Sequence, residues 1–309
     1  MLRRMPQQVI VHAPAKLNLA LAVGPRDAGG MHPICSWMVT VNLYDDLAVK
    51  RLPADRFSRY AIIWHKDARR RGEIDWSITK DLAVRAHLAL ERRAQRKLPV
   101  QLKLEKRIPL GGGLGGGSSD AAAMLHAVNR LYDLGLAAEE LAKIGAEIGT
   151  DVPFLVHGGS AIVEGLGDRL DRHAEVPELH AVVAFPEASC STGEVYGRFD
   201  DLDPGPLRDG AVRALAGALP QAPRGDGLFN DLAAAAVKIA PALADHLARL
   251  AEVAQRPAHV SGSGSSLFIL CDDPLHTEHL AQAIEQRCGI PAVAVAATRG
   301  GGEKRIEAD

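Results

Sequence analysis

Six of the seven residues from Gly111 to Gly117 are glycine, and this run constrains the fold more than any other part of the chain. Each glycine costs conformational entropy on folding, so a run of six needs a physical reason. Close approach of the backbone to an anion supplies one, because amides without side chains can converge on it and a following helix adds its positive N-terminus. Ser118 or Ser119 can cap that helix, or turn a hydroxyl toward a phosphate or a metal ion. A flexible linker is the weaker interpretation, because the run lies between a predicted strand and an amphipathic helix.

The run also contains G-x-G-x-x-G, through Gly111, Gly113 and Gly116, which raises the alternative of a dinucleotide-binding fold. That fingerprint usually follows the first strand of a βαβ unit, whereas here a hundred residues precede it. The segment beyond Leu134 predicts another helix rather than a strand that ends in an acidic residue. No Gly-Lys-Ser/Thr sequence ends the run, so a Walker loop is excluded as well. The sequence therefore predicts a phosphate-binding loop of a third type.

Length and composition limit the class of protein. The 309 residues are enough for two domains or one large domain, and 47% hydrophobic with 24% charged residues is ordinary for a globular protein. A net charge of −2 argues against broad nucleic-acid or membrane-surface binding, which needs a basic excess. No apolar stretch is long enough to cross a membrane, and the polar start does not predict a signal peptide. We therefore expect neither nucleic acid nor a membrane as a partner.

The four cysteines favour a reducing compartment. Cys35, Cys190, Cys271 and Cys288 are far apart and form no C-x-x-C pair, so we expect neither a disulfide framework nor a zinc ribbon, and a cytoplasmic location. Cys271 does lie among possible metal ligands (Asp272, Asp273, His276 and His279), but carboxylates are favoured before a helix in any case. No protein metal site is predicted.

Hydrophobic periodicity predicts an α+β chain. Alternating residues predict strands over 17–23, 37–43, 47–52, 100–104, 180–185 and 292–297, and spacing of three to four predicts helices over 78–94, 119–134, 141–148, 231–253 and 276–287. The C-terminal order of strand, turn, strand, helix and strand suggests an antiparallel sheet backed by helices. We place the boundary near residue 170, giving domains over 1–170 and 171–309. Arg69, Arg70 and Arg71 are expected to form a solvated loop, because adjacent arginines repel one another.

Three separate motifs in order resemble the GHMP kinase superfamily. They are Pro14 to Leu19 (PAKLNL), Pro109 to Ala123 with the glycine run, and Val260 to Ser266 (VSGSGSS). Within that superfamily the chain is most similar to the 4-diphosphocytidyl-2-C-methyl-D-erythritol kinase family. The segments that carry this likeness are Gly113 to Ala122, Gly149 to Phe154, Gly165 to Asp168, Ser191 to Tyr196 and Asn230 to Leu232.

The resemblance implies a fold and a reaction. The fold would have an N-terminal domain like domain 2 of ribosomal protein S5 and a ferredoxin-like C-terminal domain. The reaction would move the γ-phosphoryl group of ATP, with Mg²⁺, to the 2-hydroxyl of the cytidine-linked polyol. Asp151 would act as the base or orienting group and Lys16 as its cationic partner. ATP would lie on Pro109, Leu110, Gly111, Gly112, Gly113, Leu114, Gly115, Gly116, Gly117, Ser118 and Ser119, and the acceptor on Asn18, Met31, His32, Thr192, Tyr196 and Ser265.

One departure from the family pattern leaves the acceptor open. The family usually has Asp-Gly-Tyr-His in its first substrate loop, where this chain has Gly29-Gly30-Met31-His32. A kinase for another small alcohol (a sugar, homoserine or a mevalonate-type acid) and a non-catalytic nucleotide-binding regulator are the alternatives. Each residue also has a purely structural interpretation: Lys16 as a lysine at a strand end, Asp151 as a turn cap before Pro153, and His32 as an ordinary loop histidine.

Overall fold

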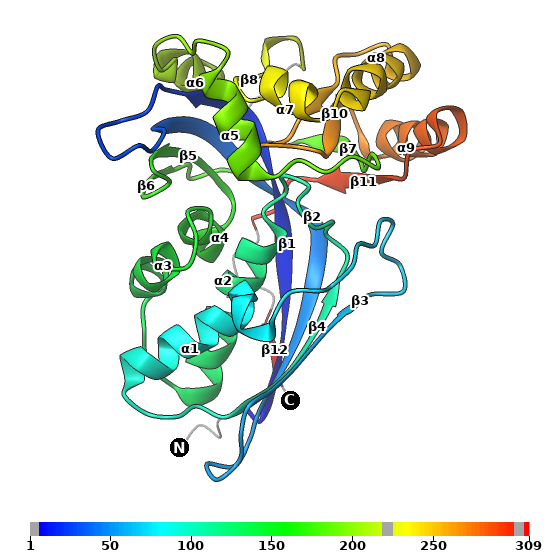
Figure 1. Ribbon diagram of the computed structural model, residues 1–309. Coiled ribbons are helices and arrows are strands. Elements are labelled where there is room, and N and C mark those ends of the chain that lie inside the picture. The colour runs from blue at the N-terminus through cyan, green and yellow to red at the C-terminus, as the bar shows by residue number, and fades with distance from the viewer. Residues whose placement is uncertain (1–5, 218–224, 300–305, 309) are drawn as a thin grey trace.

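Two long antiparallel strands run through the whole molecule. In the computed structural model, which describes residues 6–217, 225–299 and 306–308, β1 (Gln8–Val23) pairs with β2 (Ile34–Arg51) over nearly its full length (Figure 1). The sheet built on them has the order β12-β1-β2-β4-β3, with a β5–β6 hairpin joined to β2 and β8 joined to β1. The remaining strands are β3 (Arg59–Trp64), β4 (Val100–Lys106), β5 (Ser160–Gly165), β6 (Arg169–Arg172), β8 (Phe229–Asn230) and β12 (Ile306–Ala308).

Helices of the N-terminal part pack on this sheet (Figure 1). They are η1 (Ile78–Lys80), α1 (Leu82–Ala94), α2 (Gly116–Tyr132), α3 (Ala138–Ala146) and α4 (Val152–His157). α2 lies at the centre of this layer, where small alanines on most of its faces let α1, α4 and β1 approach closely. The helix that carries the glycine run is therefore fixed on several sides by apolar packing.

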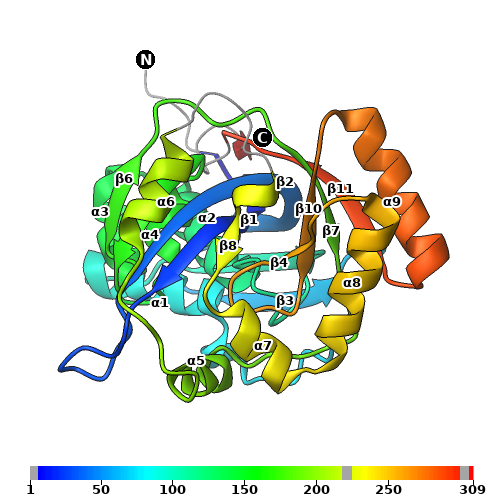
Figure 2. The same cartoon turned by 90° about the horizontal axis from the view of Figure 1, so that it is seen from above.

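The second sheet is smaller and antiparallel, with the order β11-β7-β10-β9. Its strands are β7 (His180–Ala184), β9 (His259–Val260), β10 (Leu267–Cys271) and β11 (Ala292–Ala296). In chain order this is 4-1-3-2, the ferredoxin-like arrangement, which confirms the predicted architecture of the C-terminal part. The accompanying helices are α5 (Thr192–Asp200), α6 (Asp209–Ala216), η2 (Gly225–Gly227), α7 (Ala233–Ile239), α8 (Ala242–Ala254) and α9 (Pro274–Cys288) (Figure 2).

The two sheets share a hydrophobic core. Trp37 and Leu17 of the first sheet are completely buried in the same cluster as Phe185 and Phe268 from the second. The chain also returns to the first sheet after residue 171, through β8 and β12. A boundary near residue 170 stays a prediction. No helix within the described residues is long and apolar enough to span a bilayer.

Several element boundaries differ from expectation. The strands expected over 37–43 and 47–52 form the single strand β2, and the helix expected over 231–253 is two helices separated at Ala240 and Pro241. β3, β5 and β6 were not predicted. Neither Ser118 nor Ser119 caps α2, because its N-cap is Gly115 and the helix begins at Gly116. Before α7, the side-chain amide of Asn230 donates to the Val260 and Gly262 carbonyls, and the carboxylate of Asp231 accepts from the Val23 amide.

Candidate active site

The glycine loop is attached to the sheet by a buried aspartate. Oδ1 of Asp45, in the middle of β2, accepts hydrogen bonds from the backbone amides of Arg107 and Ile108. Its Oδ2 lies 2.5 Å from Nζ of Lys106, which also bonds Asp120 on α2 at 2.5 Å. Burial opposes the charge on Lys106, but the two carboxylates outweigh it and raise the pKa of this ammonium. The charged lysine thus ties β2, the start of the loop and the first turns of α2 together.

The loop itself packs against the VSGSGSS motif of residues 260–266. A Cβ atom on Gly113 would lie 2.0 Å from the carbonyl oxygen of Ser261, and Gly113 has a positive φ of +71°. The Ser266 amide donates to the Gly112 carbonyl at 3.2 Å, and Ser261 Oγ to the Gly113 carbonyl at 3.2 Å. Glycine is therefore required at position 113 for packing between the two motifs, a reason additional to ligand approach.

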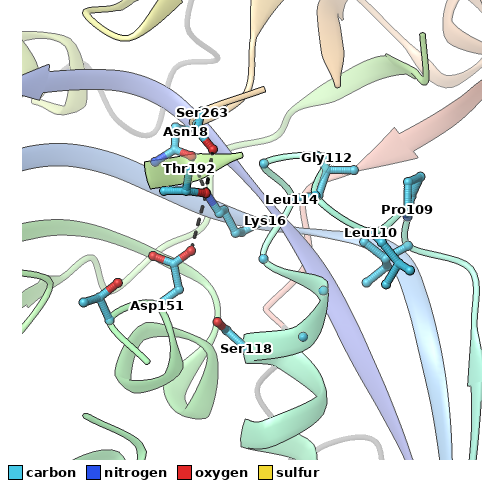
Figure 3. A pocket seen from close by; sticks show the side chains of 18 of the residues that line it. Lys16, Asn18, Pro109, Leu110, Gly112, Leu114, Ser118, Asp151, Thr192 and Ser263 are labelled. Atoms are coloured by element: carbon cyan, nitrogen blue, oxygen red, sulfur yellow. Dashed lines mark hydrogen bonds and ion pairs between the residues drawn. The ribbon is translucent and has the colours of Figure 1, made fainter. Parts of the chain in front are cut away.

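A cavity of about 410 Å³ opens between the glycine loop and the C-terminal part (Figure 3). The loop lines it from Pro109 to Ser118, and the beginning of α2 faces it. Helix N-termini and convergent backbone amides favour anions, so this wall suits a polyphosphate. The other lining groups are Lys16, Asn18, Leu21, Ile34, Met38, Leu82, Lys106, Ile108, Thr150, Asp151, Thr192, Tyr196, Leu232, Gly262 and Ser263.

Lys16 and Asp151 meet at the centre of this cavity (Figure 3). Lys16 lies on β1 with only 5% of its side chain exposed, and its Nζ is 3.6 Å from Oδ2 of Asp151 and 2.5 Å from Oδ1 of Asn18. Asn18 in turn donates to Ser36 Oγ at 2.8 Å. Because Lys16 and Asn18 are two positions apart on one strand, both point into the cavity while Leu17 enters the core. The interpretation of Lys16 as a strand-end lysine that reaches to solvent does not fit this burial.

Asp151 is accessible from the cavity, with 27% of its side chain exposed. It occupies the N-cap position of α4, yet its side chain caps no backbone amide. The preceding Thr150 packs against Gly167, where a Cβ atom would come within 2.7 Å of the Thr150 carbonyl oxygen. The carboxylate is thus held by a tight turn and faces Lys16 rather than its own helix.

α5 forms the opposite wall with Thr192 and Tyr196. Thr192 Oγ1 lies 3.1 Å from Ser263 Oγ, and this contact joins α5 to the VSGSGSS motif of residues 260–266. Burial and the charge of Asp151 raise the pKa of Tyr196 to about 12, so this phenol stays protonated and can donate a hydrogen bond at neutral pH. The ring of His32 packs against the ring of Tyr196, with ring centroids 5.2 Å apart.

Four of the predicted site residues do not line the cavity. His32 is buried, with Nδ1 2.9 Å from the Gly24 carbonyl and Nε2 3.2 Å from Asp200. Met31 is 51% exposed outside the cavity. Ser265 is buried and donates to the Ala188 carbonyl, and Ser119 is buried beneath the first turn of α2.

Sequence reasoning missed Lys106, Thr150 and Ser263. For Lys106 a signal existed: Val100, Leu102 and Leu104 alternate into the core, and continuing this period of two places position 106 on the same buried face. Ser263 lies in a motif that was recognised, but its neighbour Ser265 was preferred. The solvated loop expected at Arg69 to Arg71 is wrong for Arg70, which donates to Ser265 Oγ at 3.2 Å and to the Ala188 carbonyl at 2.9 Å.

The described residues contain no group of histidine, cysteine, aspartate and glutamate side chains that could hold a metal ion. Of the ligand types gathered near Cys271, Asp272 pairs with Arg256 and Asp273 caps α9. Any metal ion in the cavity beside the glycine loop would therefore rely on phosphate oxygens for much of its coordination.

The comparisons with known proteins agree with this geometry. Residues 81–159 match the family model described as the GHMP kinases N terminal domain. A crystal structure of 4-(cytidine 5′-diphospho)-2C-methyl-D-erythritol kinase superposes with a TM-score of 0.75 at 33% identity, covering 94% of this chain and all of that one. Homoserine kinase from Cytophaga hutchinsonii shares the fold at a TM-score of 0.67 and 18% identity. The fold and the glycine-lined cavity thus define a phosphotransferase of the GHMP kinase class.

Sequence relatives define the family more narrowly. The 4-diphosphocytidyl-2-C-methyl-D-erythritol kinase of Pseudarthrobacter chlorophenolicus is 33% identical over an alignment of 312 positions, gaps included. This alignment covers 93% of this chain and 92% of the relative. The enzyme of the same name from Nocardia farcinica is 36% identical and covers 88% of each chain. The chain belongs to the 4-diphosphocytidyl-2-C-methyl-D-erythritol kinase family.

Proposed function

We propose that this chain transfers the γ-phosphoryl group of ATP to the 2-hydroxyl of 4-diphosphocytidyl-2-C-methyl-D-erythritol. The observation that carries the proposal is the 3.6 Å contact between buried Lys16 and accessible Asp151, directly beside the glycine loop. A carboxylate and an ammonium at the edge of a phosphate-binding wall are what transfer to an alcohol needs, because catalysis of this reaction rests on positioning and charge neutralisation. The free thiols of all four cysteines support a reducing compartment, which we propose to be the cytoplasm.

Asp151 would accept or orient the proton of the acceptor hydroxyl. The ammonium of Lys16, 3.6 Å from this carboxylate, faces the side from which the phosphoryl group would arrive. Asn18, already bonded to Lys16, fixes the direction of that ammonium and leaves the acceptor a polar neighbour. These two residues on one rigid strand would keep the reacting groups aligned.

The triphosphate would lie along the loop between Pro109 and Ser118, with backbone amides and the N-terminus of α2 as donors. Mg²⁺ fits this wall, because it binds mainly through substrate phosphates and water with one or two protein oxygens, and Ser118 and Asp151 both line the cavity. Bound there, Mg²⁺ would neutralise charge on the phosphates. On the other wall, Thr192 and Tyr196 would bind the acceptor, with Tyr196 as a hydrogen-bond donor.

A coupled ADP-release assay against a panel of alcohols tests the assignment. We expect turnover with 4-diphosphocytidyl-2-C-methyl-D-erythritol and little with homoserine, mevalonate or simple sugars. Strong turnover of a non-nucleotide alcohol with none of the cytidine compound would replace the proposed acceptor. Binding of ATP without transfer to any acceptor would instead indicate the nucleotide-binding regulator.

A further inference from the structure

A second cavity, of about 330 Å³, lies away from the active site among α3, α4 and β6. Figure 1 shows these elements grouped on the side of the molecule opposite β3. None of the residues that line it belongs to the site described above. They are His126, Ala138, Glu139, Val156, His157, Gly158, Gly159, Arg172, His173, Ala174, Val176 and Arg299.

The charged groups around this cavity are mostly basic. Arg172 and Arg299 face one carboxylate, Glu139, and three histidines complete the polar lining. Within the described part of the chain, no carboxylate lies within ion-pairing distance of Arg172. A guanidinium without a carboxylate partner beside a polar cavity is available to bind an oxyanion, for which its planar donors are well suited.

A hydrogen-bonded chain leaves Nε2 as the donor of the His173 ring, which lines this cavity. Trp37 Nε1 donates to Ser160 Oγ at 2.9 Å, so the hydroxyl proton of Ser160 is free to be donated to Nδ1 of His173, 2.7 Å away. Burial lowers the pKa of His173, which favours the neutral ring. The neutral ring then carries its only proton on Nε2, the nitrogen that remains to meet a ligand.

His157, at the end of α4, is the group that would respond to an anion. Burial and then the charge of Arg172 lower its pKa; His126 acts in the same direction and Glu139 opposes it. The groups that face it therefore come from α2, α3, β6 and the segments after β6 and β11. The neutral ring would take up a proton when a dianion neutralises Arg172, because an adjacent negative charge favours the imidazolium.

We propose that this cavity binds a phosphate group, either inorganic phosphate or a phosphate monoester, between Arg172, His157 and His173. The two arginines would supply charge-assisted hydrogen bonds and His173 a neutral one. Proton uptake by His157 would accompany binding, so the affinity for the phosphate dianion should fall as the pH rises. The carboxylate of Glu139 would limit the cavity to one anionic group.

The test is a titration with inorganic phosphate followed through the histidine ring signals in NMR spectra. Magnesium and an unhydrolysable ATP analogue at saturation would occupy the active site, so that only the second cavity is free. We expect saturable shifts of His157 and His173 and a raised pKa of His157. Arg172→Gln should weaken binding about tenfold, because it removes a charge-assisted contact, whereas Arg85→Gln, an exposed arginine on α1, should leave it unchanged.

His157→Gln provides a second variant, in which affinity for the phosphate dianion, once the ionisation of phosphate itself is allowed for, should no longer fall as the pH rises. Arg172 is exposed, so thermal unfolding should show that its variant folds normally. Methyl phosphate in place of phosphate separates a monoester site from one that takes only the free ion. The proposal is wrong if the rings do not respond to phosphate at 20-fold molar excess or more, or if Arg172→Gln and Arg85→Gln bind equally well.

Discussion

At the scale of single residues, Asp151 is the group on which transfer should depend most. Asp151→Asn keeps the shape of the side chain but removes the proton acceptor, so we expect kcat to fall by about 10²–10⁴-fold with ATP affinity nearly unchanged. Steady-state kinetics and calorimetric ATP titration measure the two effects. Asp55→Asn, an exposed aspartate in the β2–β3 loop, is the matched control. Equal losses of turnover and ATP affinity would mean that Asp151 serves the structure of the cavity instead.

Gly113 allows the packing explanation to be tested against a matched glycine. Gly113 and Gly135 have almost the same φ, +71° and +68°, but an added Cβ would strike the Ser261 carbonyl at position 113 and meet nothing within 4 Å at position 135. Gly135→Ala should therefore cost only the backbone strain, about 1–2 kcal/mol. Gly113→Ala should lower Tm further and abolish ATP binding. Similar Tm values for the two variants would show that the contact with Ser261 is not required.

At the scale of elements, the segment between β3 and α1 joins the two parts of the molecule. Arg70 reaches Ser265 and the Ala188 carbonyl, and Arg69 lies 3.6 Å from Glu285 on α9. Burial lowers the pKa of Arg70, which has no carboxylate bonded to it among the described contacts. The guanidinium therefore holds Ser265 of the Ser261–Ser266 turn, and Gly262 and Ser263 of this turn line the candidate active site.

Arg70→Gln should loosen that turn. We expect KM for the acceptor to rise roughly three- to tenfold with a smaller change in kcat, since two hydrogen bonds from a charged group are lost at a partly exposed position. Arg71→Gln is the control, because Arg71 bonds the Lys66 carbonyl within its own loop. A drop in kcat at constant KM would argue for a direct part in transfer.

An element could be predicted where its own sequence pattern agreed with the contacts that it makes in the folded molecule. The short apolar strands of the C-terminal sheet follow from periodicity, whereas their ferredoxin-like arrangement followed from the resemblance. β2 could not be recognised as one strand, because Tyr44-Asp45-Asp46 is polar like a turn. The partners that make a buried Asp45 acceptable, Lys106 and the amides of Arg107 and Ile108, lie 61 to 63 positions later. The Lys16–Asp151 pair followed from the resemblance. The positions of His32 and Ser265 did not, since their partners Asp200 and Ala188 are distant in sequence.

At the scale of the whole molecule, buried histidines should make stability sensitive to mild acid. Burial lowers the pKa of His87, His157, His173 and His259 below the ordinary value of 6.5. The unfolded chain therefore binds protons more readily than the folded one. The stabilisation is complete above pH 6.5 and is lost as the pH falls through that value toward the folded pKa values, by up to about 1.4 kcal/mol per pH unit for each histidine.

Urea unfolding between pH 7.5 and 5 measures this slope. His87 is completely buried, with Nδ1 2.8 Å from the Tyr60 hydroxyl and Nε2 2.8 Å from the Leu98 carbonyl. His87→Gln should be less stable at neutral pH but show a shallower pH dependence. A free energy of unfolding that is constant across this range would contradict the prediction.

The length of β1 limits how the enzyme can open. One strand contributes Val9 to the core beneath α1 and α2, Leu17 to the core between the sheets, and Val23 to the core of the C-terminal part. A hinge motion between the two parts of the molecule would have to bend β1 and break its hydrogen bonds with β2 beside Lys16. We therefore expect substrates to enter and products to leave by displacement of surface loops, while β1 stays straight and Lys16 keeps its position.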